Sequence, residues 1–214
     1  AAMLARMGAV LDLEARPVRS PILNDLKDLH MAREALVKNR TAAKNRAKTL
    51  TLAILKRHNA EQLRQIERQI AAVEKEIMAL IKADPDLARR FAILVSIPGV
   101  SAITACALLI DMPELGTLGQ RQAASLAGLA PVARQSGNWT GRAFIRGGRA
   151  NVRQALYMPA LVAMRFNPDL KAKYDGLKAA GKASKVAITA VMRKLVLLAN
   201  ALLRDGRKWT PSHA

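Results

Sequence analysis

Ser136 stands among residue types that together could carry out phosphoryl chemistry. It lies in the run Arg134-Gln135-Ser136-Gly137, and more arginines follow at 142, 146 and 149. A serine hydroxyl can attack phosphorus, and guanidinium groups stabilise the charge that develops on the phosphoryl oxygens. The alternative is a turn serine that hydrogen-bonds its own backbone, and residue chemistry alone favours that alternative.

Arginine is the only charged residue type between Leu115 and Pro168, because this window contains neither lysine nor any acid. The planar guanidinium pairs with phosphate through two hydrogen bonds, so an all-arginine set indicates phosphate contacts. Arg149 and Arg153 begin a helix predicted over 151–165, where the helix dipole disfavours cations unless an anion binds there. A bound phosphate would supply that anion. We therefore predict nucleic-acid contacts from five arginines: Arg134, Arg142, Arg146, Arg149 and Arg153.

A further candidate phosphate contact is Ile97-Pro98-Gly99-Val100-Ser101, which precedes an apolar helix ending near Ile110. It is similar to the hairpin of a helix-hairpin-helix module. There Gly99 would permit a tight turn, and the free N–H groups after Ser101 would face a DNA phosphate. An ordinary loop between core helices fits these residues equally well.

General bases and metal ligands are scarce around these candidates. No histidine or carboxylate lies near Ser136 in the sequence, which argues against a self-contained hydrolase triad. The acids after residue 91 are few and dispersed, so we assign no metal to this chain: Asp111, Glu114, Asp169, Asp175 and Asp205. The single cysteine, Cys106, excludes an intramolecular disulfide and is predicted to be a buried core residue.

The composition indicates a folded protein with a polyanionic partner. Lysine and arginine number 35 against 16 acids, for a net charge of +19, while 51% of the residues are hydrophobic. Nucleic acid is the first candidate partner. Apolar runs such as 103–110 and 195–199 are shorter than the roughly 20 residues of a membrane span, so we expect no span and a cytoplasmic location. The chain does not begin with Met, and we expect it to be a piece of a longer protein.

The elements that must position these residues are mainly helices. Residues 21–84 almost lack Gly and Pro, and apolar residues recur there at alternating steps of three and four: Leu63, Ile66, Ile70, Val73, Ile77 and Leu80. This spacing predicts the heptad seam of a coiled coil, which argues for association. A weaker seam upstream, from Leu23 to Val37, predicts a helical hairpin with its turn near His58-Asn59.

Glycine and proline return after Phe91, which predicts a second domain. There 132–135 and 142–145 are predicted to be extended segments joined by a turn over 137–141. The expected fold is mainly α: a long coiled-coil helical hairpin at 21–90, then a compact helical domain at 91–209 with a helix-hairpin-helix-like motif and a small β-hairpin.

Short motifs occur in a fixed order along the second half of the chain: Ser96-Ile97-Pro98-Gly99-Val100, Ala127-Gly128-Leu129-Ala130-Pro131, Ser136-Gly137, Gly147-Gly148 and Arg153-Gln154-Ala155-Leu156-Tyr157. In this order and spacing they resemble the insertion-sequence one-ten family of transposases, relatives of the Piv-type invertases. The resemblance spans Ala1 to Trp209, and it places Ser136 on the family's nucleophilic serine.

The resemblance implies several parts that this chain lacks. It implies a RuvC-like domain whose four acids bind Mg²⁺, with an active site assembled between different subunits. Residues 1–20 resemble the end of that domain, so the metal ligands are expected outside this chain, and the chain alone is not expected to cut and join DNA. The implied partners are target and donor DNA, a bridge RNA, and further copies of the chain in a dimer or tetramer.

The expected function is therefore that of a DNA transposase or recombinase, whose Ser136 attacks a DNA phosphodiester during RNA-guided transposition. Such a protein would work at the nucleoid of a bacterial or archaeal cell. The alternative is a non-enzymatic architectural protein that holds DNA or RNA through the helix-hairpin-helix-like motif and the arginines.

Overall fold

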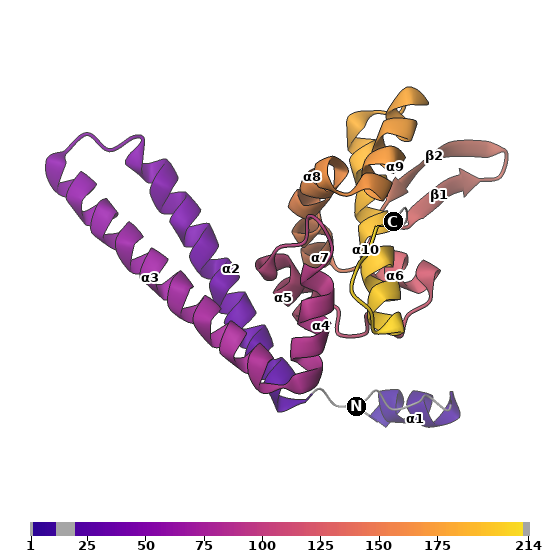
Figure 1. The fold of residues 1–214 in the computed structure, drawn as a ribbon, viewed down its shortest axis with the longest axis horizontal. Helices are drawn as coiled ribbons and strands as arrows, with labels where there is room; N and C mark the ends of the chain where they lie inside the picture. The colour runs from indigo at the N-terminus through magenta and orange to yellow at the C-terminus, as the bar shows by residue number, and fades with distance from the viewer. Residues whose placement is uncertain (1, 12–19, 212–214) are drawn as a thin grey trace.

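The computed structural model describes residues 2–11 and 20–211, and these are mainly helical, as predicted. A long helical hairpin leans away from a compact helical unit, and one β-hairpin projects from that unit (Figure 1). The elements in chain order are α1 (Ala2–Val10), α2 (Pro21–Ala47), α3 (Ala53–Ala83), α4 (Pro85–Val95), α5 (Ala102–Asp111), α6 (Gln120–Leu126), β1 (Pro131–Ser136), β2 (Trp139–Ile145), α7 (Ala150–Ala155), α8 (Tyr157–Phe166), α9 (Pro168–Ala179) and α10 (Ser184–Asp205).

The predicted apolar seam of α3 lies inside the hairpin. Its residues Ile66, Ile70 and Ile77 are buried, and α2 is the helix that packs along α3. The sequence predicted a helical hairpin here, as observed, and also assigned the seam to contacts between subunits. In the structure α2 folds back onto it, so this apolar stripe is already covered within one chain.

The turn of the hairpin lies at residues 48–52, ahead of the predicted position at His58-Asn59. Asn59 is buried within α3, and its Nδ2 donates a hydrogen bond to the carbonyl of Ala43 at 3.1 Å. No Gly or Pro marks the true turn. Instead Thr49 Oγ1 donates to the Arg46 carbonyl at 3.0 Å, satisfying one of the acceptors that a helix end leaves free.

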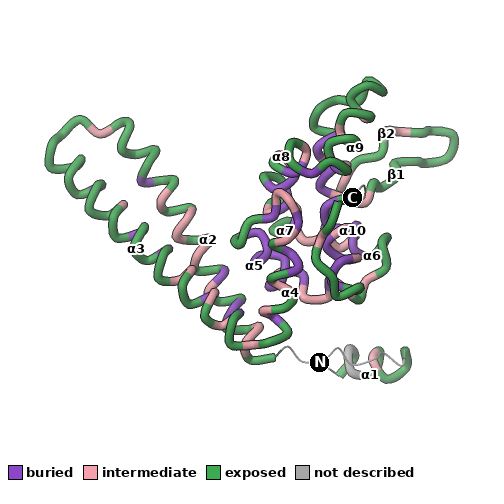
Figure 2. Tube along the Cα trace, in the orientation of Figure 1, coloured by how far each residue is buried: buried purple, intermediate pink, exposed green. Residues whose placement is uncertain are grey.

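Helix α10 is the centre of the compact unit and contacts α4, α6, α8 and α9. It is long and apolar enough to cross a membrane by length and composition, but half of that stretch is buried inside the protein. Leu195, Val196 and Ala199 have no exposed surface, and Figure 2 shows buried stretches along this helix within the compact unit. Its apolar character is therefore accounted for by the core that it forms.

A buried asparagine ties the loop before α6 to this central helix. Asn200 Oδ1 accepts a hydrogen bond from the Gly116 N–H at 2.8 Å, and Asn200 Nδ2 donates to the Leu118 carbonyl at 2.7 Å. A buried amide with both ends bonded avoids the penalty of an unpaired polar group. The loop that carries Glu114 is thereby held against α10.

Helices α4 and α5 join the helical hairpin to the compact unit. Leu87 and Cys106 pack with Ile77 and Ile81 of the hairpin, whereas Leu94 belongs to the core around α10. Asp84 starts α4 by accepting hydrogen bonds from the N–H groups of residues 86 and 87. The predicted boundary between residues 90 and 91 thus falls inside a continuous helix that contributes to both cores.

The β-hairpin is present as predicted, but its turn is shorter. Strands β1 and β2 are antiparallel, Ser136 pairs with Trp139, and only Gly137 and Asn138 remain between them. Residues 139–141, expected in the turn, are paired strand residues. Both strands are exposed along most of their length (Figure 2).

The single helix predicted over 151–165 is divided into α7 and α8 at Leu156. Pro159 explains the division, because proline has no N–H and its ring clashes with the carbonyl four residues earlier, which belongs to Ala155. Helix α7 ends at that residue.

Candidate active site

Ser136 and Arg134 lie on one face of the β-hairpin together with the residues that pair with them. Ser136 pairs with Trp139, and Arg134 pairs with Gly141. Alternate residues of a strand point to the same face, and directly opposed residues share it. Gln135 and Thr140 form the next pair and therefore occupy the opposite face.

The Trp139 ring lies on this face and contacts both Gly141 and Arg134. It occupies the space above Gly141, where any Cβ would collide with it. The guanidinium carbon of Arg134 lies 5.5 Å from the centre of the ring, within the range of a cation–π contact. Trp139 is still 53% exposed. Trp139 thus orients Arg134, and no acidic side chain among the described residues neutralises the charge of this arginine.

The Ser136 hydroxyl is exposed and makes no hydrogen bond to any residue that the structure describes. This geometry does not support the alternative in which the serine bonds its own backbone. An exposed, unbonded hydroxyl can approach a phosphate from outside the protein. The hairpin tip leaves room for such a ligand because the surrounding residues 131–140 are all exposed.

The five predicted nucleic-acid-binding arginines do not form one group. Arg134 and Arg146 are exposed, and neither forms an ion pair within the described part of the chain. Arg142 lies in β2, but its side chain is outside the described residues. Arg149 and Arg153 bind groups of the protein itself.

Arg149 forms a two-pronged ion pair with Glu114, whose two oxygens lie 2.7 and 2.8 Å from the guanidinium nitrogens. Arg149 Nη1 also donates to the Asp111 carbonyl at 2.7 Å. The hydrogen bonds that Arg149 donates to Glu114 raise the pKa of Arg149 above its usual value. The inference that a cation at this helix start needs a bound phosphate is therefore wrong, because a carboxylate just outside the acid-free window supplies the anion.

Arg153 joins two loops at the base of the β-hairpin. Its Nη1 donates to the Gly147 carbonyl at 2.9 Å and to the Gly128 carbonyl at 3.4 Å. The backbones of Gly128 and Gly148 touch here, since a Cβ added to Gly148 would lie 2.5 Å from Gly128 Cα. Arg149 and Arg153 thus fix the segment that leads out of β2, and so they position the hairpin that carries Ser136.

Gly99 and Ser101 also have partners within the fold. Gly99 has a φ of +98°, and a Cβ there would lie 2.8 Å from both the Pro159 carbonyl and the Ala163 nitrogen of α8. Ser101 begins α5, and its Oγ accepts a hydrogen bond from the Thr104 N–H at 3.3 Å. Packing against α8 explains the glycine, so the phosphate contacts of Gly99 and Ser101 stay predictions.

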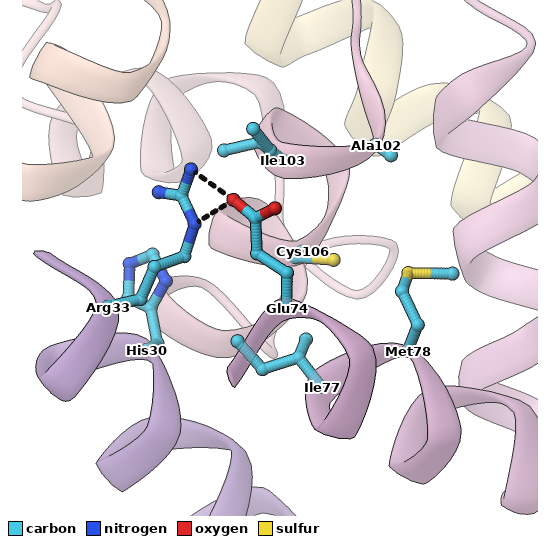
Figure 3. Close-up of a pocket in the computed structure, with 8 residues that line it drawn as sticks. All are labelled: His30, Arg33, Glu74, Ile77, Met78, Ala102, Ile103 and Cys106. Carbon is cyan, nitrogen blue, oxygen red and sulfur yellow. Dashed lines mark hydrogen bonds and ion pairs between the residues drawn. The ribbon is translucent and has the colours of Figure 1, made fainter. Parts of the chain in front are cut away.

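A separate pocket of about 110 Å³ lies where the helical hairpin meets α5 (Figure 3). Arg33 and Glu74 form an ion pair at 2.8 Å beside it. The nucleophile at its wall is Cys106, a buried residue as predicted, and burial raises the pKa of its thiol to about 11. A thiol that stays protonated at neutral pH is a poor nucleophile, so Cys106 is not a candidate nucleophile.

Two contributors to the hairpin site were not predicted. Glu114 lay one residue outside the acid-free window, and Trp139 had been placed in a turn. The tryptophan could have been noticed, because aromatic residues make up only 3% of the chain and this one stands between Asn138 and Thr140 in a basic segment. Among the described residues, no three acidic, histidine or cysteine side chains gather to hold a metal ion.

Comparison with known proteins places this hairpin within a defined domain. The model of the transposase IS116/IS110/IS902 family matches residues 91–175. The chain is 34% identical over 161 residues to the 43.6 kDa protein of insertion element IS110 from Streptomyces coelicolor, covering 74% of this chain and 38% of that protein. It is 30% identical over 213 residues to the pilin gene-inverting protein of Moraxella bovis, covering 97% and 65%.

A third relative, the 42 kDa protein of insertion element IS900 from Mycobacterium paratuberculosis, is 31% identical over 202 residues, covering 85% of this chain and 50% of that protein. The chain thus spans between 38% and 65% of the length of these relatives. The family model, the insertion-element relatives and the pilin gene-inverting protein support the family that the sequence motifs resemble. The chain belongs to the IS116/IS110/IS902 family of transposases.

Proposed function

We propose that the complete protein is a DNA transposase or recombinase in which Ser136 Oγ attacks a DNA phosphodiester. The observation that carries this proposal is the exposed Ser136 hydroxyl, which has no hydrogen-bond partner among the described residues and shares a hairpin face with Arg134. The hairpin lies inside the segment that matches the transposase family. The pilin gene-inverting relatives support DNA as the substrate.

In this reaction a bond forms between Ser136 Oγ and phosphorus, and the bond from phosphorus to the leaving strand oxygen breaks. The serine proton passes to the leaving oxygen or to solvent. Arg134 stabilises the charge on the phosphoryl oxygens, and Trp139 keeps the Arg134 guanidinium beside the serine. Arg146 follows β2 at the other end of the hairpin from Ser136, so its proposed contact is with nucleic acid away from the reacting phosphate. Arg149 and Arg153 act on this step only by holding the hairpin base.

The family resemblance implies Mg²⁺, but the described residues do not fit that ion. Among the described residues, no group of three acidic, histidine or cysteine side chains could hold a metal ion together. We propose that the magnesium ligands belong to the RuvC-like domain that the resemblance implies, and we expect this chain by itself to bind nucleic acid without joining DNA strands. The step proposed above uses only groups that this chain provides.

The proposed partners are target and donor DNA, a bridge RNA that selects them, and further copies of the protein in a dimer or tetramer. The α3 seam is covered by α2, so contacts between copies need another surface. The exposed Leu52, Ile54 and Leu55 at the hairpin turn are the best candidates for that contact.

The proposal is tested by replacing Ser136 with alanine in the complete protein, and Thr140→Ala is the matched control. The Thr140→Ala substitution removes a hydroxyl from the opposite face of the same hairpin. After incubation with substrate DNA, denaturing gels report the covalent protein–DNA adduct, and binding is measured separately. We expect Ser136→Ala to bind DNA normally and to form no adduct, whereas Thr140→Ala forms it. An undiminished adduct with Ser136→Ala would refute the nucleophile, and equal losses in both variants would assign Ser136 a structural role.

A further inference from the structure

A groove of about 380 Å³ lies between the end of strand β2 at the base of the hairpin and the first turns of α10. Phe144 and Ile145 line it from the hairpin side. Lys185, Val186 and Arg193 line it from α10. The groove therefore combines apolar residues with cations, and it adjoins the hairpin that carries Ser136.

The α10 side of the groove is a single stripe of the helix. Lys185, Thr189 and Arg193 recur at steps of four residues, which places them one above the other along one face. Lys185 and Arg193 are eight residues apart, which corresponds to about 12 Å along the helix axis at 1.5 Å per residue. The two cations thus lie at the ends of a stripe, and the residues between them have small or apolar side chains.

Neither cation of this stripe is paired within the described residues. Lys185 and Arg193 form no ion pair there, and no acid lines the groove. The sequence has no Asp or Glu between Asp175 and Asp205. Cations that the fold does not neutralise are available to an anionic partner.

The apolar part of the groove is exposed as well. Phe144 is 42% exposed and Val186 is 55% exposed. A partner that fills this groove must offer flat apolar surface and negative charge at a spacing of a few ångströms. Unpaired nucleotides have both, because their base faces are free and their phosphates lie alongside. A duplex fits poorly, since its base faces are stacked on one another.

We infer that this groove binds unpaired nucleotides of a nucleic-acid strand. Phosphates contact Lys185 and Arg193, and a base packs against Phe144 and Val186. The inference rests on the proposed function, because it assumes a protein that handles nucleic acid, and it adds the kind of strand that is bound. A strand in the groove would lie next to strand β2 of the hairpin that presents Ser136.

The test measures binding of labelled single strands by fluorescence anisotropy over a range of salt concentrations. The probes are short oligothymidine, short oligouridine and a duplex of equal length. The double variant Lys185→Gln with Arg193→Gln is expected to reduce the salt slope for single strands by about 1.4, at about 0.7 for each lost phosphate contact. The preference between oligothymidine and oligouridine tells whether DNA or RNA is the natural strand, and either result supports the groove.

The matched control is Lys56→Gln with Arg57→Gln, which removes the same charge from exposed positions at the start of α3. That pair is expected to leave the salt slope unchanged. Phe144→Ala is expected to weaken single-strand binding about fivefold, the lower end of the range for a lost base–aromatic stack. Val186→Glu, which is compatible with an exposed helix position, should also weaken it by placing a carboxylate beside the phosphates.

Three results would overturn the inference. They are equal slopes for the groove variant and its control, equal effects on duplex and single strands, and displacement of the strand by polyglutamate as readily as by oligonucleotide. The Ser136 proposal is judged separately by the covalent adduct. Normal single-strand binding by the groove variants, with the adduct still dependent on Ser136, would reject the groove alone.

Discussion

The base of the β-hairpin gives a sharp prediction, because Gly147 and Gly148 are adjacent, have similar backbone angles and differ in their surroundings. Their φ values are +68° and +64°. A Cβ on Gly147 would have no neighbour within 4 Å, whereas one on Gly148 would strike the backbone of Gly128 and lie 2.7 Å from the Leu126 carbonyl. Replacing each glycine by alanine therefore separates backbone strain from collision.

The expected losses in the free energy of unfolding follow from backbone strain and from collision. Alanine in the left-handed region costs about 1–2 kcal/mol at either position. Gly148→Ala adds about 1–3 kcal/mol, the usual cost of forcing extra atoms into a packed site, because the atoms in its way are backbone and cannot rotate aside. We expect Gly147→Ala to lower the free energy of unfolding by about 1–2 kcal/mol, and Gly148→Ala by about 2–5 kcal/mol.

The assay is thermal unfolding followed by far-ultraviolet circular dichroism. For a protein of this size the difference of about 1–3 kcal/mol between the variants corresponds to about 2–12 °C in Tm. At a temperature where both variants are folded, the complete protein with Gly148→Ala should also form less of the Ser136 adduct than the protein with Gly147→Ala. The collision displaces the backbone that positions the hairpin.

Equal Tm values for Gly147→Ala and Gly148→Ala would refute this reasoning. That result would mean that the backbone around Gly128 and Gly148 accommodates a methyl group without lowering the free energy of unfolding. A lower Tm for Gly148→Ala with an unchanged adduct would retain the packing argument, and it would reject the role of this contact in positioning Ser136.

Two further predictions concern charges. Glu114→Gln should lower the free energy of unfolding by about 1 kcal/mol, because the pair with Arg149 is partly exposed; in a double-mutant cycle with Arg149→Met, the two losses should not add. Burial raises the pKa of Cys106 from 9.0 to about 11, so at about pH 8 the folded protein has about 100-fold less thiolate than the unfolded chain, and its reaction with a thiol reagent should be slower at least in proportion. The corresponding stability is present below pH 9.0 and is lost as the pH rises through about 11, which denaturant titration would detect. Thiol modification as fast as in the unfolded chain would contradict the burial of Cys106.

The helical hairpin shows where local pattern was sufficient. The spacing of Ile66, Ile70 and Ile77 predicted a long helix with one apolar face, and both hold. The weaker seam from Leu23 to Val37 also predicted a helix that folds back onto this face. The pattern did not decide whether subunits also meet at the same face, because a helix from the same chain and one from another chain present similar residues. The turn was misplaced because residues 48–52 contain no Gly or Pro, and because Asn59, a common turn residue, is used as a buried hydrogen-bond donor.

The arginine-rich segment shows where pattern was insufficient. Residue types predicted a basic segment with a serine on a β-hairpin, and the motifs identified the family; both are properties of short stretches of sequence. Which arginines are paired inside the fold depends on contacts that residue types do not reveal. Arg149 pairs with Glu114, 35 residues earlier, and Arg134 rests on Trp139 only because the strands pair in one register.

The sequence by itself therefore determined the helical class, the hairpin with its serine and the transposase family, because these depend on local propensity, apolar periodicity and motif order. Only the tertiary structure decided which cations are neutralised inside the fold and which remain available, since pairing depends on distances set by packing. It also brought Lys185 and Arg193 of α10 beside Phe144 of β2, forming a groove that no spacing along the chain indicates.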